Sequence, residues 1–405
     1  MKKFVCALLA VLVALSSAFV YSGAGATKEN TIYDAVEADA FMLVSLNETG
    51  HAILAQRNEN KVKYPASLTK VATAMVVIDR VKNLEKQVVV SQSAVDAVRG
   101  TGAQSAYLYA GEKVSIEQLL YLAMIHSACD ACQVLAESVA GSVPKFVDMM
   151  NKWAKSIGCK NTHFVNPDGL HDDNHYSTAV DLTRISLKAL KNKKFLTIAT
   201  ATEYAFDGSV FYHTNRMLHE PLKEYYYPYA KGIKTGYTKQ AGRCLITMAK
   251  KNNRSYLAVI LDAPLLFTKD RKEYNTAFFD AKELFEWAFK DWDKRKVLEA
   301  FEPVAALPVE EASGSEKVRL MSLSNIYTML PKNAQPEDVS IEPIDPPKEL
   351  KAPLKRGDFV CKAAVKYKNK TIGTVNLAVY ESVEQNVFLS AVQGIGSWIQ
   401  GILKK

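Results

Sequence analysis

Three short motifs in this chain hold residue types that can act together on an acyl group. They are Ser67-Leu68-Thr69-Lys70, Ser127-Ala128-Cys129 and Lys234-Thr235-Gly236, in that order. Each motif occurs by chance in many sequences, so none of them is informative alone. Together they supply a serine nucleophile, a lysine that can be its base, a second hydroxyl that can relay a proton, and a cation for a carboxylate. This combination predicts acyl transfer through a serine ester.

The first motif is predicted to lie at the start of a buried helix. Pro65-Ala66 ends a loop, and the mostly apolar residues 68–75 follow. Ser67 would then lie at the helix N-terminus, where free N–H groups can stabilise an oxyanion, with Lys70 one turn later. Lys70 can deprotonate Ser67 only if burial and a nearby positive charge, which Lys234 could supply, lower its pKa. An N-terminal cap is the alternative role for Ser67.

The third motif is predicted to lie on an edge strand that precedes the strand at Arg243. On an edge, Thr235 and its backbone could pair with an extended peptide as an added strand. Lys234 would face a terminal carboxylate, and Gly236 would leave room for the ligand. The alternative is an ordinary hairpin with an exposed lysine.

The elements that must position these motifs are predicted to form one α/β domain from about Thr31 to Asp293. Helical periodicity dominates residues 67–196, and an amphipathic helix over residues 272–289 closes the domain. Strands are expected at residues 41–45, 51–56, 203–206, 243–250 and 255–261. Strands from both ends around a helical middle predict an α+β sandwich, a sheet covered by helices.

Short strands and turns over residues 296–384 predict a second, all-β domain. Strands are expected at residues 318–321, 359–367 and 371–380. The segment from Glu342 to Pro347 is expected to be loop, because its prolines cannot continue a ladder. No catalytic motif falls in this domain.

The two ends of the chain predict export and attachment to a membrane. Lys2 and Lys3, an apolar run over residues 4–20 and Ala24-Gly25-Ala26 fit a signal peptide of residues 1–26. Residues 385–405 predict an amphipathic helix too short and polar to span a membrane, and packing on the β-domain is the alternative. Its apolar face would hold Phe388, Val392, Ile395, Ile399 and Ile402.

Charge and cysteine usage exclude several function classes. The formal net charge of +8 suits an anionic membrane or wall surface, while scattered lysines in an exported protein exclude a nucleic-acid partner. The odd number of cysteines after residue 26 does not make a disulfide framework. Cys129 and Cys132 are predicted to be buried thiols one helical turn apart rather than a redox pair. His171 and His175 follow a turn, so their spacing does not predict a metal site.

The chain resembles the low-molecular-mass penicillin-binding proteins, the serine D-alanyl-D-alanine carboxypeptidases. Beyond the three motifs, residues 164–170, 175–181 and 130–137 match the signature of that family. The resemblance is strong from about Tyr33 to Trp292. It implies a β-lactamase-like DD-peptidase domain over residues 27–295, a β-rich domain over residues 296–384 and a membrane-anchoring helix over residues 385–405.

The resemblance also implies catalytic roles. Ser67 would be the nucleophile and Lys70 its base. Ser127 would pass the proton to the departing D-alanine amine, and Lys234 would hold this relay electrostatically. The backbone N–H groups of Ser67 and Tyr237 would form the oxyanion hole.

Substrate-binding roles are implied for Thr235, Gly236 and an arginine. Arg271 lies where the family places an arginine for the substrate carboxylate, and Arg243 is the other candidate. Cys129 departs from the family, which usually has asparagine there. A thiol is a much poorer hydrogen-bond partner than an amide. The change from asparagine to cysteine therefore affects whether the acyl group is transferred to water, which is hydrolysis, or to a second peptide, which is transpeptidation.

The function implied is removal of the terminal D-alanine from peptidoglycan stem peptides that end in D-Ala-D-Ala, without a metal or organic cofactor. Beta-lactam antibiotics would acylate Ser67 and remain bound, since no E-x-x-L-N segment supplies a deacylating carboxylate. The enzyme would be extracytoplasmic, attached peripherally to the outer face of the cytoplasmic membrane. The alternatives are a D,D-transpeptidase, an endopeptidase or a β-lactamase on the same scaffold, or a weakly active wall-binding protein in which Cys129 has impaired the site.

Overall fold

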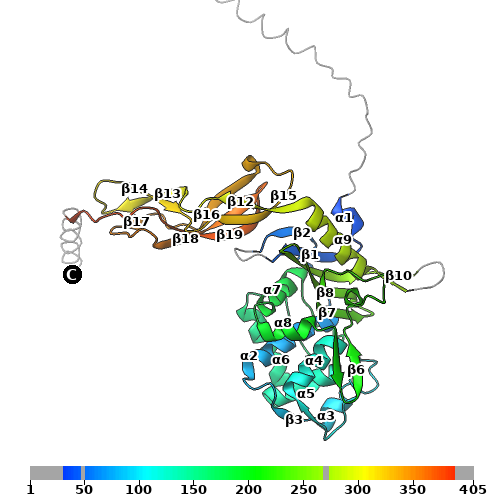
Figure 1. Ribbon diagram of the computed structural model, residues 1–405. Helices are drawn as coiled ribbons and strands as arrows, with labels where there is room; N and C mark the ends of the chain where they lie inside the picture. The colour runs from blue at the N-terminus through cyan, green and yellow to red at the C-terminus, as the bar shows by residue number, and fades with distance from the viewer. Residues whose placement is uncertain (1–30, 47–50, 268–272, 388–405) are drawn as a thin grey trace, which may run out of the picture.

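An antiparallel five-stranded sheet joins the two ends of the first domain in the computed structural model, which describes residues 31–46, 51–267 and 273–387 (Figure 1). The strand order is β2-β1-β9-β8-β7, with β1 paired to both β2 and β9. The bounds are β1 Ala40–Ser45, β2 Ile53–Arg57, β7 Ala230–Thr238, β8 Gly242–Lys251 and β9 Arg254–Ala263. As predicted, β7 is an edge strand, and it carries the third motif.

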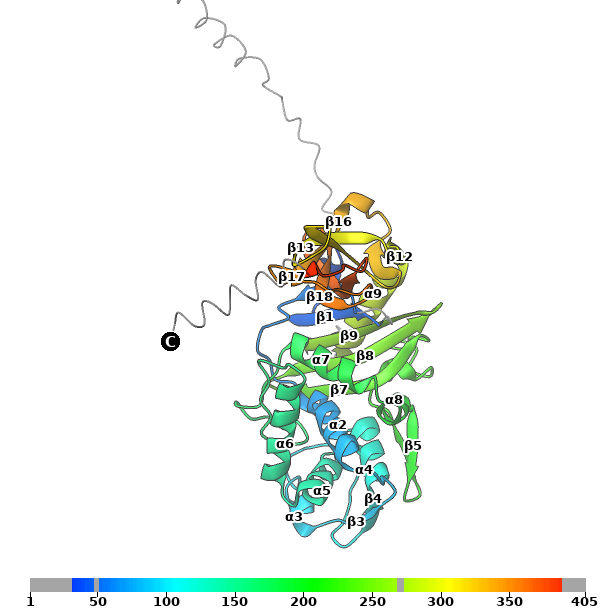
Figure 2. The same cartoon turned by 90° about the vertical axis from the view of Figure 1, so that its left-hand side faces the viewer.

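Helices cover both faces of this sheet, which confirms the predicted sandwich (Figure 2). One face packs against α9 (Thr276–Asp291), beside the short α1 (Ile32–Ala35). The other face carries a larger helical layer. Its members are α2 Lys70–Arg80, α3 Gln92–Asp96, α4 Ile116–Tyr121, α5 Cys129–Ala140, α6 Val143–Ser156, α7 Ala179–Ala189 and α8 Lys193–Thr200.

Alternating side chains along β8 divide the core into two parts. Ile246 packs toward the helical layer with Leu68. Its neighbour Leu245 packs toward α9, where Phe285 lies. Successive strand residues point to opposite faces, so the part of a strand that is buried on both sides must be mostly apolar, as residues 244–249 of β8 and 256–261 of β9 are.

Two short hairpins lie beside the helical layer. The predicted strand at residues 203–206 is β5 (Glu203–Phe206), and it pairs with β6 (Ser209–Tyr212). The other hairpin, β3 (Gln87–Val89) with β4 (Lys113–Ser115), was not predicted. Its strands have only three residues each, which is too short to show alternation against the helical pattern around them.

The β-domain extends from the α9 side of the sheet, away from the helical layer (Figure 1). Its six-stranded sheet has the order β16-β18-β19-β14-β13-β17, and β12 pairs with β15. The bounds are β12 Trp292–Leu298, β13 Pro303–Glu310, β14 Lys317–Met321, β15 Ile326–Pro331, β16 Val339–Ile344, β17 Leu350–Lys351, β18 Phe359–Tyr367 and β19 Lys370–Val379. The expected loop from Glu342 is wrong in part, because β16 continues through Pro343 to Ile344. As an edge strand, β16 tolerates a residue that lacks an N–H donor.

The predictions for the two chain ends lie outside the described residues. These are the signal peptide of residues 1–26 and the amphipathic helix, of which residues 388–405 are not described. Across the described ranges, none of the helices has both the length and the apolar character needed to cross a bilayer.

Candidate active site

Ser67 and Lys70 lie together where two helical segments meet. A 3₁₀ turn, η1 (Ala66–Thr69), carries Ser67, and α2 begins directly after it at Lys70. The Lys70 Nζ atom donates to Ser67 Oγ at 2.9 Å and to the carbonyl oxygen of Asp168 at 2.7 Å. The amine is therefore aimed at the serine hydroxyl, as a base for that hydroxyl must be.

Two glycines, Gly169 and Gly236, pack closely against the backbone of the turn that carries Ser67. Ala66 has a φ of +46°, a conformation that residues other than glycine rarely adopt. A Cβ atom on Gly169 would lie 1.9 Å from the Ala66 carbonyl oxygen, and one on Gly236 would lie 3.1 Å from Ser67 N. The missing side chain of Gly236 thus leaves room for the backbone of residues 65–67. From the sequence alone, we expected this glycine to leave room for a ligand.

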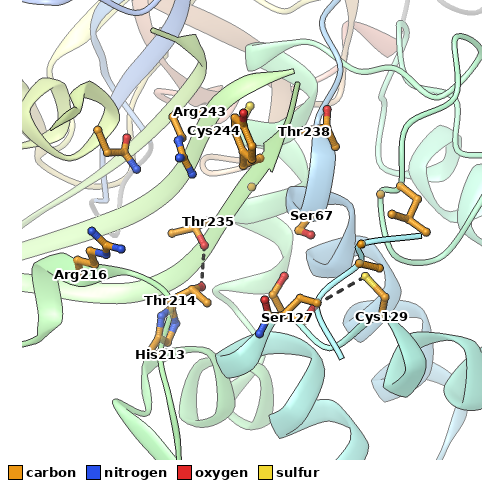
Figure 3. Close-up of a pocket in the computed structure, with 18 of the residues that line it drawn as sticks. Ser67, Ser127, Cys129, His213, Thr214, Arg216, Thr235, Thr238, Arg243 and Cys244 are labelled. Atoms are coloured by element: carbon orange, nitrogen blue, oxygen red, sulfur yellow. Dashed lines mark hydrogen bonds between the residues drawn. The ribbon is translucent and has the colours of Figure 1, made fainter. Parts of the chain in front are cut away.

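Ser127 lies in a break between two helices, on the wall that faces Ser67 (Figure 3). The π-helical turn η2 (Leu122–His126) ends there, and α5 begins at Cys129. Ser127 has a φ of +68° and is only 7% exposed. Such backbone strain is often found at functional sites, where the surrounding fold compensates for it.

Cys129 lies beside Lys70. Its sulfur is 3.3 Å from Lys70 Nζ and 3.8 Å from the Ser127 carbonyl oxygen. Burial raises the pKa of the thiols of Cys129 and Cys132. Both are free cysteines, as predicted. At neutral pH the thiol form predominates, which supplies a weak donor and a sulfur that accepts weakly from Lys70, where an asparagine would supply a strong acceptor and two donors.

The two buried lysines oppose each other's charge. Burial and the repulsion of Lys70 hold the pKa of Lys234 well below its usual range. Burial disfavours charge on Lys70 as well, but the Cys129 and Cys132 sulfurs and the Asp168 carboxylate raise the pKa of Lys70 above its usual value. The lowered pKa therefore falls on Lys234 rather than on Lys70. Because the two amines repel each other's charge, protonation of one disfavours protonation of the other.

The remaining residues of the third motif lie along β7. Lys234 is fully buried, and its Nζ donates to the Thr235 carbonyl oxygen at 3.0 Å. The Thr235 hydroxyl bonds the Thr214 hydroxyl at 2.6 Å (Figure 3). Tyr237 is 48% exposed, so its ring is accessible to a ligand. Within the described residues, the free edge of β7 is available for an added strand.

A cleft of about 1250 Å³ connects these groups. Ser67, Ser127, Cys129, Thr235, Gly236 and Tyr237 all line it. The structure thus brings the predicted residues together, with Lys70 and Lys234 buried beneath the surface. A cleft of this size accommodates a short peptide.

Of the two candidate arginines, Arg271 lies outside the described residues, while Arg243 lines the cleft. The Arg243 guanidinium stacks 4.0 Å from the centre of the Tyr237 ring. Arg216 lines the cleft too, on the 3₁₀ turn η3 (Arg216–Leu218), and was missed. No short motif marks it, since its place in the cleft depends on the tertiary contact between Thr214 and Thr235.

His175 has a structural role in the turn that carries Ser67. One ring nitrogen bonds the Thr69 hydroxyl at 2.8 Å, and the other accepts from the backbone N–H of Val165 at 3.2 Å. Accepting at one nitrogen requires the neutral ring. Burial, the main cause, lowers the pKa of His175 to about 4.

This burial predicts a loss of stability in acid. An unfolded histidine binds a proton near pH 6.5, but folded His175 binds one only near pH 4. The contribution is complete above about pH 6.5, and about 3 kcal/mol is lost as the pH falls to 4. His175→Asn should flatten the dependence of the free energy of unfolding on pH in this window, measured by urea titration. An unchanged slope in the His175 variant would contradict the assignment.

Comparisons with known proteins agree with this geometry. A family model described as D-alanyl-D-alanine carboxypeptidase matches residues 26–265, and one described as the C-terminal domain of penicillin-binding protein 5 matches residues 292–385. The D-alanyl-D-alanine carboxypeptidase DacF of Bacillus subtilis is 26% identical over 368 residues, which cover 89% of this chain and 90% of DacF. The crystal structure of penicillin-binding protein 5 from Haemophilus influenzae has a TM-score of 0.69 at 28% identity, over 86% of this chain and 98% of that one. The Streptomyces K15 DD-transpeptidase has a TM-score of 0.55 at 27% identity, over 63% of this chain and 97% of its own.

Proposed function

Because this chain belongs to the D-alanyl-D-alanine carboxypeptidase family, we propose that it removes the terminal D-alanine from peptidoglycan pentapeptide stems through an acyl-enzyme on Ser67. One observation carries the assignment of the nucleophile. Lys70 Nζ lies 2.9 Å from Ser67 Oγ, and both face a cleft of peptide size. None of the observations on the described residues favours transpeptidation, endopeptidase activity or β-lactam hydrolysis instead.

Acylation follows from the positions of the hydroxyls and amines. Ser67 Oγ attacks the carbonyl carbon of the penultimate D-alanine, and Lys70 in its neutral form accepts the serine proton. The N–H groups of Ser67 and Tyr237 would stabilise the oxyanion. Ser127 then passes a proton to the leaving D-alanine amine, and the C–N bond breaks.

In deacylation, water is the nucleophile and the Ser67 oxygen is the leaving group. Water attacks the ester carbonyl, its proton moves to the same base, and the Ser67 oxygen leaves with a proton. Beta-lactam antibiotics would form the same ester, and its hydrolysis would be slow because the described residues that line the cleft include no aspartate or glutamate. Residues 130–137 hold Asp130, but the main chain and Ser105 occupy its carboxylate oxygens.

The function is tested by D-alanine release from a purified pentapeptide that ends in D-Ala-D-Ala. The protein should release D-alanine, and Ser67→Ala should not, while Ser93→Ala at an exposed serine should match the unchanged protein. Release by the Ser67 variant at the original rate would contradict the proposal.

Replacing Cys129 with asparagine should raise the rate of hydrolysis by about tenfold. An amide can accept from Lys70 and donate to a substrate carbonyl, and hydrogen bonds to charged groups contribute about 1.5–3 kcal/mol. The measurement is the rate of deacylation after a single turnover. Cys132→Ala is the matched control, because that thiol donates to the Ala128 carbonyl instead. An unchanged rate in Cys129→Asn would show that this site works equally well with cysteine.

We place the enzyme outside the cytoplasm, on the outer face of the cytoplasmic membrane. The support is the signal-like residues 1–26 and the apolar spacing in residues 385–405. The whole protein should float with anionic liposomes, and a variant that ends at Val387 should not. This variant keeps the hydrogen bond from Gln385 to Glu311. Equal flotation of the two proteins would contradict attachment through the tail.

A further inference from the structure

A fully buried carboxylate, that of Asp168, lies close to Ser67 and Lys70 and is not used in acylation or deacylation. The side chain is 0% exposed. It comes directly before Gly169, which packs against the turn that carries Ser67. Burying a carboxylate is unfavourable unless hydrogen bonds or an opposite charge compensate for the lost hydration. The surroundings of Asp168 should therefore show what compensates for it.

Hydrogen bonds from two segments fix the Asp168 side chain. Gln133 Nε2, on α5 one turn after Cys129, donates to Asp168 Oδ2 at 2.6 Å. The Leu170 N–H donates to Asp168 Oδ1 at 2.9 Å. Both oxygens accept, as the oxygens of an ionised carboxylate do. Within the described part of the chain, no lysine, arginine or histidine forms an ion pair with this carboxylate.

The backbone beside this carboxylate is bound to α2, the helix that begins at Lys70. Lys70 Nζ donates to the Asp168 carbonyl oxygen at 2.7 Å. One turn later, Thr73 Oγ1 donates to the Pro167 carbonyl oxygen at 2.6 Å. These two bonds attach the loop to one face of α2, so the Asp168 carboxylate is held at a fixed place relative to the Lys70 amine. Charges interact more strongly in the interior than in water.

The titratable groups that act on the Lys70 amine belong to α5, to β7 and to the loop that follows α6. They are Cys129, Cys132, Lys234, Asp168 and His175. Burial lowers the pKa of Lys70, but the two sulfurs and then the carboxylate raise it above its usual value. At neutral pH the thiols carry no charge, since burial raises their pKa, and His175 is neutral because burial lowers its pKa to about 4. Of these groups, Asp168 is then the negative one, and it is not among the groups that act on Lys234.

We propose that Asp168 is a positioning residue for the proton of Lys70, because its carboxylate favours the proton on Lys70 over Lys234. This inference rests on the proposed function, since Lys70 is the amine that activates Ser67. The cation donates to Ser67 Oγ at 2.9 Å and so orients the hydroxyl in the free enzyme. Lys70 must then release one proton to solvent before it can accept the proton of Ser67. The rate of acylation should therefore rise with pH into the alkaline range.

Asp168→Asn removes the charge and keeps the shape of the side chain. The new amide oxygen can accept from the Leu170 N–H, and the Gln133 amide can turn over to accept from the new NH₂ group. The measurement is the single-turnover rate of Ser67 acylation by a chromogenic beta-lactam between roughly pH 6 and 11. Without the carboxylate, Lys70 should lose its proton about one pH unit lower. The variant should thus acylate about three- to tenfold faster than the original protein at neutral pH, and this advantage should shrink toward the alkaline end.

Asp181→Asn is the matched control. Asp181 is another buried carboxylate, 1% exposed, which binds Arg184 and the N–H groups of residues 160 and 161. It is not among the groups that act on Lys70. Loss of its charge should lower the free energy of unfolding and leave the pH dependence of acylation unchanged.

A second measurement needs no change at Asp168. In protein labelled with ¹³C at the lysine Cε atoms, the resonances of Lys70 and Lys234 are assigned by their loss in Lys70→Met and Lys234→Met. In the otherwise unchanged protein, the Lys70 resonance should have the chemical shift of a charged lysine at neutral pH. The Lys234 resonance should have the chemical shift of a neutral one.

The outcomes separate this inference from the proposed function. An unchanged pH profile in Asp168→Asn, or a rate that falls equally at every pH, would show a purely structural role and overturn the inference. A neutral Lys70 in the labelled protein would overturn it too, while D-alanine release that depends on Ser67 would still support the function. If the unchanged protein were not acylated at any pH, the proposed function would fail, and the Lys70 resonance would still show where the proton lies.

Discussion

Replacing Lys70 with methionine should reduce the rate of Ser67 acylation by roughly two to four powers of ten. Methionine has a similar length and fills the buried space, but it cannot accept the serine proton. The serine hydroxyl is then too weak a nucleophile, since the 2.9 Å contact to an amine is lost. Single-turnover acylation by a chromogenic beta-lactam measures this rate directly.

The control for this change is Lys231→Met. Lys231 lies on β7 near the third motif but is exposed, so the acylation rate should stay within about twofold of the original. Circular dichroism should show that the Lys70 variant remains folded. Rapid acylation of that folded variant would contradict the role of Lys70 as the base.

Gly169→Ala should destabilise the protein by roughly 3 kcal/mol or more and slow acylation about a hundredfold. At a φ of +84° alanine is strained, and its Cβ would lie 1.9 Å from the Ala66 carbonyl oxygen, which is main chain and cannot rotate away. The turn that carries Ser67 must therefore move. Urea unfolding and the single-turnover rate are the two measurements.

Gly158→Ala is the control that separates the strain of a positive φ from the steric clash of the added Cβ atom. Gly158 has a φ of +87°, but no atom lies within 4 Å of the Cβ position. This variant should lose only about 1–2 kcal/mol and keep the acylation rate. Equal effects of the two substitutions on the rate would show that close packing against Ala66 does not position Ser67.

The three motifs could be recognised in the sequence because each occupies only three or four consecutive residues. Ser67 and Lys70 are separated by one turn, so local geometry alone brings them together. The strands β8 and β9 were predictable for a similar reason, since each has a continuous, mostly apolar centre with charged residues near its ends.

The features of the site that were not predicted depend on contacts between segments that are distant in the sequence. Gly169 and Gly236 reach the turn at Ala66 from segments far along the chain, so neither packing role is visible locally. Arg216 enters the cleft through the bond between Thr214 and Thr235. The proton distribution of the lysines is a property of burial, and burial is set by the whole fold.

The most direct test of the account is the intact mass of the purified protein after exposure to benzylpenicillin, followed by peptide mapping. We expect one stable adduct, mapped to Ser67 and absent from Ser67→Ala. An adduct on another residue, or none on folded protein with the antibiotic intact in solution, would contradict it.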